Sequence, residues 1–340
     1  MVRRFVGCGA LLVLTLSVFT AAVAASAADS AARPIRAGLI GLDTSHVIAF
    51  TQTINDPKAA GPLADVKIVA GFPGGSPDLP DSWNRVKDYT EKLRAAGVEI
   101  VPSIDALLEK VDVVLLESVD GRPHLAQAIP VIKAKKPLFV DKPMAGSLVD
   151  AIVIFRLAER ENVPCFSCSS LRYTPDYQAL RSGKHPLGKV KECVAFGPYH
   201  VEPHHPDLFW YGVHGVESLY TIMGPGCKTV RRAAENKVVG QWADGRKGTY
   251  FGKDSYTAEI VGEKGAGAVG QFAGYAPMLV EVCKFFKTRK APICPQETIE
   301  LFAFMEAADK SKKAGGAEVS IAEVIADAQK AADKKLAELK

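Results

Sequence analysis

The stretch VDVVLLESVDGRPHLAQAIPVIKAKKPLFVDKPMA, residues 111–145, decides the fold of this chain. It opens with an unbroken apolar run, residues 113–116, which is typical of a strand buried on both faces. Apolar residues at spacings of three and four then run from Leu125 to Ile132 and indicate a helix. A second apolar run, residues 138–140, follows. Strand, helix and strand in this order predict a crossover between two parallel strands.

Polar residues come directly after both of these strands. Open parallel sheets bind their ligands beyond the carboxyl ends of the strands. Ser118, with His124 soon after it, follows the first strand, and Asp141 and Lys142 follow the second. We therefore expect these side chains to face a ligand, and a lysine at such a position to meet the ligand rather than bulk water.

The same alternation extends on both sides of this stretch. Apolar runs at residues 35–40, 66–70, 98–101 and 163–169 alternate with helical patterns. This order predicts an α/β domain with a doubly wound parallel sheet over residues 35–169. The length of 340 residues leaves room for a second domain over residues 170–340.

Two later motifs add to the Asp-Lys-Pro sequence at 141–143. Acid-Lys-Pro after a helix that ends in Lys-Lys-Pro resembles the signature of the Gfo/Idh/MocA oxidoreductases, the family of glucose–fructose oxidoreductase and inositol dehydrogenase, whose usual tripeptide is Glu-Lys-Pro. Residues 171–175 resemble the family's Arg-Phe-x-Pro element, where the chain leaves the first domain. Residues 210–224 resemble the helix that faces the nicotinamide, written Asp-x-Gly-x-His-x-x-Asp, with Trp210 in the place of the first acid.

The resemblance implies a Rossmann-like domain followed by an α+β domain with a mostly antiparallel sheet. It also implies NAD or NADP as cofactor, and a sugar, polyol or related alcohol as substrate. Lys142 and His214 match the catalytic pair that handles the hydroxyl proton, a role that suits a histidine titrating near neutral pH and a lysine at a partly buried strand end. The alternative for His214 is a core histidine on an apolar helix face. The expected cofactor-binding residues are Gly41, Leu42, Asp43, Thr44, Ser45, His46, Ser118, His124, Asp141, Lys142 and Pro143, and the expected substrate-binding residues are Arg172, Tyr173, His204, His205 and Glu217.

The turn after the first strand departs from the dinucleotide-binding pattern G-x-G-x-x-G. Gly41 matches the first glycine, but Asp43 and His46 stand at the second and third positions. A carboxylate about 4 Å from a phosphate would cost on the order of 4 kcal/mol at an effective dielectric constant of 20. The turn is therefore either a capped helix start that binds no phosphate, or an altered dinucleotide turn that uses the hydroxyls of Thr44 and Ser45.

A histidine-rich segment precedes the nicotinamide-facing helix. Alternate residues of an extended chain share one face, so His200, Glu202 and His204 could meet a metal ion. Pro203 and Pro206 favour an irregular loop that lines the substrate pocket, and we predict no metal there. A metal-assisted lyase or hydrolase remains the alternative that this segment would support.

The amino terminus predicts export. Two arginines at positions 3 and 4, an apolar run at 11–23 and small residues at 25–27 are typical of a signal peptide over residues 1–28. The protein is then periplasmic or secreted, and only an uncleaved segment would anchor it in a membrane. The net charge of +4 includes both arginines, and the remainder gives no reason to expect a nucleic-acid partner.

Two further expectations follow. Cys165 and Cys168 lie in one predicted strand, where residues three apart point to opposite faces, so we expect buried thiols and not a disulfide between them. Export and the altered turn also suit a carbohydrate-binding protein that keeps the fold without redox turnover. By analogy with the family, an exposed face of the second sheet would favour a homo-oligomer.

Overall fold

The first sheet lies at the base of the compact unit formed by residues 34–340. The computed structural model describes residues 33–339, so the predicted signal peptide lies outside the described residues. The strands pair in parallel in the order β3-β2-β1-β4-β5-β6, which is the doubly wound order predicted from the alternation of strands and helices. Its elements are β1 (Ile35–Ile40), α1 (Ser45–Ile54), η1 (Gly61–Asp65), β2 (Val66–Phe72), α2 (Pro80–Ala95), β3 (Glu99–Ile100), α3 (Ile104–Leu108), β4 (Val113–Leu116), α4 (His124–Lys133), β5 (Leu138–Asp141), α5 (Leu148–Arg160) and β6 (Cys165–Cys168).

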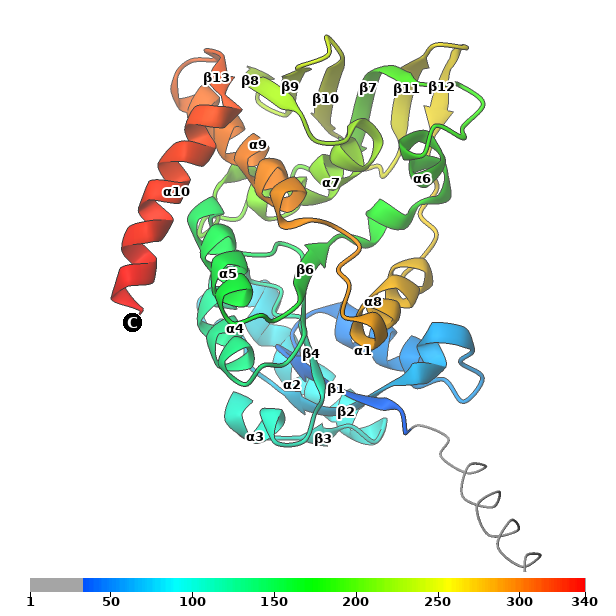
Figure 1. The fold of residues 1–340 in the computed structure, drawn as a ribbon, viewed down its shortest axis with the longest axis vertical. Helices are drawn as coiled ribbons and strands as arrows, with labels where there is room; N and C mark the ends of the chain where they lie inside the picture. Colours follow the sequence, from blue (N-terminus) through cyan, green and yellow to red (C-terminus); the bar gives the residue numbers. More distant parts are fainter. Residues whose placement is uncertain (1–32, 340) are drawn as a thin grey trace, which may run out of the picture. The chain divides into compact units, whose positions relative to one another are not determined.

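The second sheet is formed by the later part of the chain (Figure 1). Its strand order is β12-β11-β7-β10-β9-β8-β13, and every pairing is antiparallel except that of β7 with β10. The mostly antiparallel sheet expected for this half is therefore confirmed. Its elements are η2 (Ser170–Tyr173), α6 (Pro175–Arg181), β7 (Val190–Gly197), η3 (Asp207–Phe209), α7 (Gly212–Met223), β8 (Cys227–Ala234), β9 (Lys237–Trp242), β10 (Lys247–Gly252), β11 (Ala258–Gly262), β12 (Ala266–Val269), α8 (Ala276–Thr288), α9 (Pro295–Lys313), β13 (Val319–Ser320) and α10 (Ile321–Glu338).

Helix α8 follows the second sheet in sequence but packs on the first sheet, close to α1 (Figure 1). Its Phe285 contacts Phe166 of β6 edge-on, with ring centroids 4.8 Å apart. Phe166 in turn packs against Phe139 of β5. The apolar side chains of α8 thus belong to the same buried cluster as one face of the first sheet, and this packing joins the end of the chain to its beginning.

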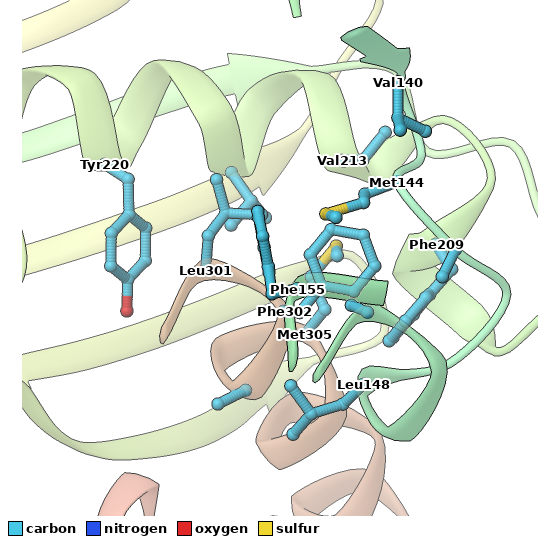
Figure 2. Packing of buried hydrophobic residues seen from close by; sticks show 14 of the residues in the cluster. Val140, Met144, Leu148, Phe155, Phe209, Val213, Tyr220, Leu301, Phe302 and Met305 are labelled. Atoms are coloured by element: carbon cyan, nitrogen blue, oxygen red, sulfur yellow. The ribbon is translucent and has the colours of Figure 1, made fainter. Parts of the chain in front are cut away.

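The other face of the first sheet continues into the core of the second half. Figure 2 shows side chains from β5 to α5, such as Met144 and Phe155, together with Phe209 of η3, Val213 of α7 and Phe302 of α9. All of these residues are buried in one hydrophobic cluster. Helix α10 also packs against α5. The two sheets therefore share a continuous core, which fixes the α7 side chains relative to the carboxyl ends of β4 and β5.

The prediction of buried thiols at Cys165 and Cys168 is confirmed. Cys165 and Cys168 are buried in different hydrophobic clusters, on opposite faces of the first sheet. Neither is in a disulfide, and of the other described cysteines only Cys294 is exposed. No helix within residues 33–339 combines the length and the apolar character that crossing a membrane requires.

Gly215 brings α7 close to the second sheet. A Cβ atom built on Gly215 would lie 2.5 Å from the ring of Tyr250, which is fully buried and cannot move aside. We expect Gly215→Ala to lower the free energy of unfolding by about 1–3 kcal/mol through overpacking, measured by urea denaturation. Gly267→Ala, at an exposed position of β12 with no atom closer than 4.0 Å to the added Cβ, is the control. Equal stability of the two variants would contradict this account of the α7 packing.

Candidate active site

A cavity of about 170 Å³ lies at the carboxyl edge of the first sheet. Lys142, from the end of β5, and His214, from the first turn of α7, both line it. The two halves of the molecule therefore each contribute an ionisable side chain to the same space, which Arg85 and His46 also line. The full lining consists of Thr44, Ser45, His46, Arg85, Val119, Lys142, Ser170, Leu171, Tyr211, His214, Tyr256, Phe272 and Tyr275.

Lys142 follows the last residue of β5, and its peptide bond to Pro143 is cis. Its side chain is half-buried, and no hydrogen bond or ion pair to it is found within residues 33–339. Lys335, in contrast, is paired with Asp150. An ammonium group held at a cavity without a fixed partner is available to a ligand oxygen.

His214 is held by a hydrogen bond of 2.9 Å between its Nδ1 and the hydroxyl of Ser169. Ser169 also accepts a hydrogen bond from the backbone of Leu171, so it is itself fixed. Burial, followed by the positive charge of Lys142 and the proximity of His46, lowers the pKa of His214 well below its ordinary value. The imidazole is therefore neutral at neutral pH and can accept a proton.

The amino-terminal turn of α1 forms another wall of the cavity. Thr44 caps the helix by accepting a hydrogen bond from His46 N at 3.4 Å. Ser45 and the His46 ring both line the cavity, and His46 Nδ1 lies 2.6 Å from Asp141 Oδ2. A helix amino terminus with hydroxyl and imidazole groups beside it favours an anionic or polar ligand group.

Gly41 is a glycine because the turn packs against the end of β4. Its φ is +85°, and a Cβ on it would lie 2.3 Å from Ser118 Oγ. The segment after β2 also covers this turn, since Leu42 N donates to Pro73 O at 2.7 Å and a Cβ on Gly74 would lie 3.4 Å from Gly41 Cα. The turn is thus enclosed by two neighbouring segments.

The side chain of Asp43 is directed away from the cavity. It is fully buried and accepts hydrogen bonds from Ser82 Oγ at 2.6 Å and from Val119 N at 2.9 Å. Burial raises the pKa of this carboxyl group, more than those hydrogen bonds lower it. Asp43 therefore ties the turn to α2 and to the segment after β4, and it is not among the residues that line the cavity.

Two predicted substrate residues pair with each other instead of lining this cavity. Arg172 and Glu217 form a buried ion pair, and Arg172 Nη1 donates to Glu297 at 2.8 Å. Tyr173 packs against the core beneath α8. His124, predicted for the cofactor side, is fully buried with its ring nitrogens 3.1 Å from Met144 O and 2.9 Å from Ser118 O. None of these four residues lines the cavity.

The histidine-rich segment connects the two halves of the molecule through an ion pair of His205 with Asp120. His205 has a fully buried side chain, with Nε2 3.0 Å from Asp120 of the segment after β4 and Nδ1 2.7 Å from Glu202. His204 is half-exposed and lies 2.8 Å from the same Glu202. Neither histidine lines the cavity. His200 instead approaches Asp254 at 3.4 Å, so the three residues considered for a metal do not converge.

The contacts of His205 with Asp120 and Glu202 predict that the stability of the protein depends on pH. Burial alone lowers the pKa of His205, but the hydrogen bonds to Asp120 and Glu202 outweigh it and raise the pKa above its ordinary value of about 6.5. A raised folded-state pKa means that the contribution of His205 is complete below the unfolded pKa and is lost as pH rises through the folded one. We expect His205→Gln to cost about 1.5–3 kcal/mol at pH near 6 and less in alkaline buffer. Thermal unfolding of both proteins across this range measures it, and a pH-independent difference would contradict it.

Sequence reasoning missed the aromatic wall and Ser169. Tyr211, Tyr256, Phe272 and Tyr275 line the cavity opposite the sheet. Tyr275 contacts the His46 ring, with centroids 4.8 Å apart. In the sequence these residues appear only as separate aromatic residues near the ends of strands and helices, a position that is also typical of ordinary core residues.

The sequence was compared with protein families and with curated proteins. Residues 82–168 match the model of the family GFO_IDH_MocA, described as an oxidoreductase family with an NAD-binding Rossmann fold. Over these residues the chain is therefore similar to the Gfo/Idh/MocA oxidoreductases. No curated protein matches the sequence.

Solved structures resemble nearly the whole described chain. A scyllo-inositol dehydrogenase from Lactobacillus casei, solved with NAD(H) and scyllo-inositol, has a TM-score of 0.66 at 15% identity and covers 85% of this chain and 100% of its own. An oxidoreductase from Agrobacterium radiobacter, solved with NAD⁺, L-tartaric acid and magnesium, has a TM-score of 0.63 at 16% identity, with 85% and 99% covered. At these identities the likeness shows a shared fold.

The residues of the cavity fit the reactive end of a nicotinamide cofactor. Polar groups at the amino terminus of α1, Lys142 and His214 surround a space into which Asp43 does not direct its charge. The cavity of about 170 Å³ is smaller than the roughly 300–1,000 Å³ of pockets that enclose drug-sized ligands. The space therefore has room for only part of a dinucleotide.

Proposed function

We infer that this protein is an NAD(P)-dependent oxidoreductase that acts on the CH–OH group of a sugar, polyol or related alcohol. The observation that carries this proposal is the convergence of Lys142 and His214 on one cavity at the carboxyl edge of the first sheet. The match of residues 82–168 to a family of NAD-binding oxidoreductases supports it independently.

The two side chains suit the proton chemistry of alcohol oxidation. When a hydride leaves the carbon, the hydroxyl proton must leave the oxygen, and neutral His214 can accept it. Lys142 can donate a hydrogen bond to the same oxygen and stabilise the negative charge that develops there. A bound nicotinamide ring supplies the acceptor for the hydride.

The substrate class is supported by the polarity and size of the site. Serine, tyrosine, histidine and lysine side chains surround the cavity, which suits a small molecule with several hydroxyl groups. The similar structures from Lactobacillus casei and Agrobacterium radiobacter were solved with a cyclic polyol and with a hydroxy acid. Both ligands have the secondary alcohol that this chemistry needs.

One observation favours a second function, which is binding of a carbohydrate without redox turnover. Asp43 bridges Ser82 and Val119, and the segment after β2 covers Gly41. Both contacts bring neighbouring segments against the turn that approaches the pyrophosphate in dinucleotide-binding folds. If these contacts hold permanently, a polyol can enter the cavity while the cofactor cannot.

Calorimetric titration of the purified protein with NAD⁺ and NADP⁺ separates the two functions. The oxidoreductase proposal expects saturable binding of one dinucleotide, followed by formation of reduced nicotinamide with a member of a panel of inositols, aldoses and tartrate. Binding of a panel member without dinucleotide binding would overturn the first function and support the second. Turnover in the absence of added dinucleotide would overturn both.

Two other expectations stand as proposals. The predicted signal peptide at residues 1–28 favours action in the periplasm or outside the cell. The half-exposed aromatic residues Phe196 and Phe251 on the outer face of the second sheet favour a homo-oligomer. Fractionation of the producing cells and light scattering of the purified protein test them.

A further inference from the structure

Glu117 is an unusual residue at the end of β4. It is fully buried, and within residues 33–339 neither of its carboxylate oxygens has a hydrogen-bond partner. A buried polar atom without a partner costs about 1–3 kcal/mol, and an unpaired buried charge costs more. A carboxylate in this position needs a compensating group.

Two further ligand atoms face Glu117. Strands β4 and β5 pair in parallel with Leu116 opposite Val140, so the next residues, Glu117 and Asp141, end side by side. Asp141 is 2% exposed, and its Oδ1 has no partner among the described residues. His46, from the first turn of α1, completes the group, and one ligand atom from each of the three residues lies within 4.8 Å of the others.

We propose that Glu117, Asp141 and His46 bind a divalent transition-metal ion, Zn²⁺ or Mn²⁺, beneath the cavity floor. An imidazole nitrogen with two carboxylates is a donor set that such ions accept at about 2.0–2.2 Å, so the side chains need to converge only slightly. The ion balances the two carboxylate charges. This site goes beyond the proposed oxidoreductase function and does not depend on it.

The competing arrangement is a proton shared between the two acids. Burial, and then the charge of Asp141, raise the pKa of Glu117, so a protonated Glu117 is chemically reasonable. A shared proton, however, engages one oxygen of each acid and leaves the second oxygen of Glu117 without a partner. A metal ion held by both oxygens of Glu117 and by Asp141 Oδ1 satisfies all three unpartnered atoms.

The ion would lie next to the reacting groups. His46 and Lys142 line the cavity directly above Asp141, and the Lys142 ammonium interacts electrostatically with both acids. This positive charge opposes metal binding, whereas the net charge of the two carboxylates favours it. The affinity for the metal ion therefore depends on the charges of this cluster, and substitutions within the cluster should change it.

Metal analysis of three proteins tests the proposal. Wild type, Glu117→Gln and Glu202→Gln are stripped with a chelator, loaded with Zn²⁺ or Mn²⁺ alone, desalted and analysed by mass spectrometry and thermal unfolding. Glu202 is the matched control, because its carboxylate is hydrogen-bonded to His204 and His205. We expect about one ion and a raised Tm for wild type and Glu202→Gln, and an affinity lowered more than about 100-fold for Glu117→Gln.

Two results would overturn the proposal. One is a wild-type protein that retains no ion while Glu117→Gln is equally or more stable, which indicates the shared proton. The other is loss of the ion in Glu202→Gln alone, which places it in the histidine-rich segment. If Glu117→Gln does not fold, the visible absorption of Co²⁺ added to wild type decides the matter: bands of a nitrogen- and oxygen-ligated ion that Zn²⁺ displaces support the site, and their absence contradicts it.

Discussion

Replacing Lys142 by methionine is expected to lower kcat/KM by about 10²–10⁴-fold for the alcohol substrate found in the panel. The ammonium group faces the cavity and has no fixed partner within the described residues, so its charge is free to act on the substrate oxygen. The ammonium group also interacts with the buried carboxyl groups of Glu117 and Asp141, so we expect its removal to lower the free energy of unfolding as well. Steady-state kinetics and denaturation of the same preparation measure both quantities.

The variant also makes a prediction for the pH profile. The positive charge of Lys142 is one cause of the lowered pKa of His214, so its removal raises that pKa. The acidic limb of the rate profile, below which His214 is protonated, should therefore move to higher pH. Lys284→Met, which removes a surface lysine paired with Glu281, is the control and should change neither rate nor profile. Unchanged turnover in Lys142→Met would remove this mechanism.

Replacing Arg172 by methionine is expected to destabilise the protein by about 3–5 kcal/mol. The guanidinium group is buried between Glu217 of α7 and Glu297 of α9, and both carboxylates are almost fully buried. Removing the cation leaves two buried carboxylates close together, with only Arg181 beside Glu297. Chemical denaturation monitored by tryptophan fluorescence gives the change in the free energy of unfolding.

The control for this prediction is an exposed pair. Arg94→Met removes the partner of Glu91 on the surface of α2, and such pairs contribute about 0–1 kcal/mol. A loss for Arg172→Met no larger than that of Arg94→Met would mean that water reaches the Arg172 network. Because Glu217 lies on the same helix as His214, the destabilised variant should also lose activity on heating before wild type does.

The first sheet could be predicted because its strands are buried on both faces and therefore consist of continuous apolar runs. Strand β8 was not predicted, because Arg232 occupies a buried position that a hydrophobic residue would usually take. Its charge is compensated by Asp207 at 2.8 Å, a partner 25 residues away in sequence. Helix α2 begins at Pro80, a boundary that is hard to find in the sequence because the exposed polar face of the helix hides the helical period. Strand β12 ends at Val269, because Gly270 takes a positive φ against the Tyr177 ring.

The site was predictable where a motif coincides with a strand end, as it does for Lys142. The partners of buried charges could not be predicted from the sequence. The pairing of Arg172 with Glu217 and the convergence of Glu117 with His46 depend on how distant segments meet. Asp43 illustrates the same limit. Its position in the glycine turn was visible in the sequence, but its direction, toward Ser82 and away from the cavity, is set by α2.

The return of α8 to the first sheet constrains how this protein can be divided or recombined. A fragment that ends near Ser169 would present the Phe139 and Phe166 face to water, because the side chains that cover it are supplied by residues 276–288. Such a fragment would tend to self-associate. A chimera that exchanges the first sheet with that of a relative must therefore exchange α8 as well. The unit to be exchanged consists of two stretches that are separate in the sequence.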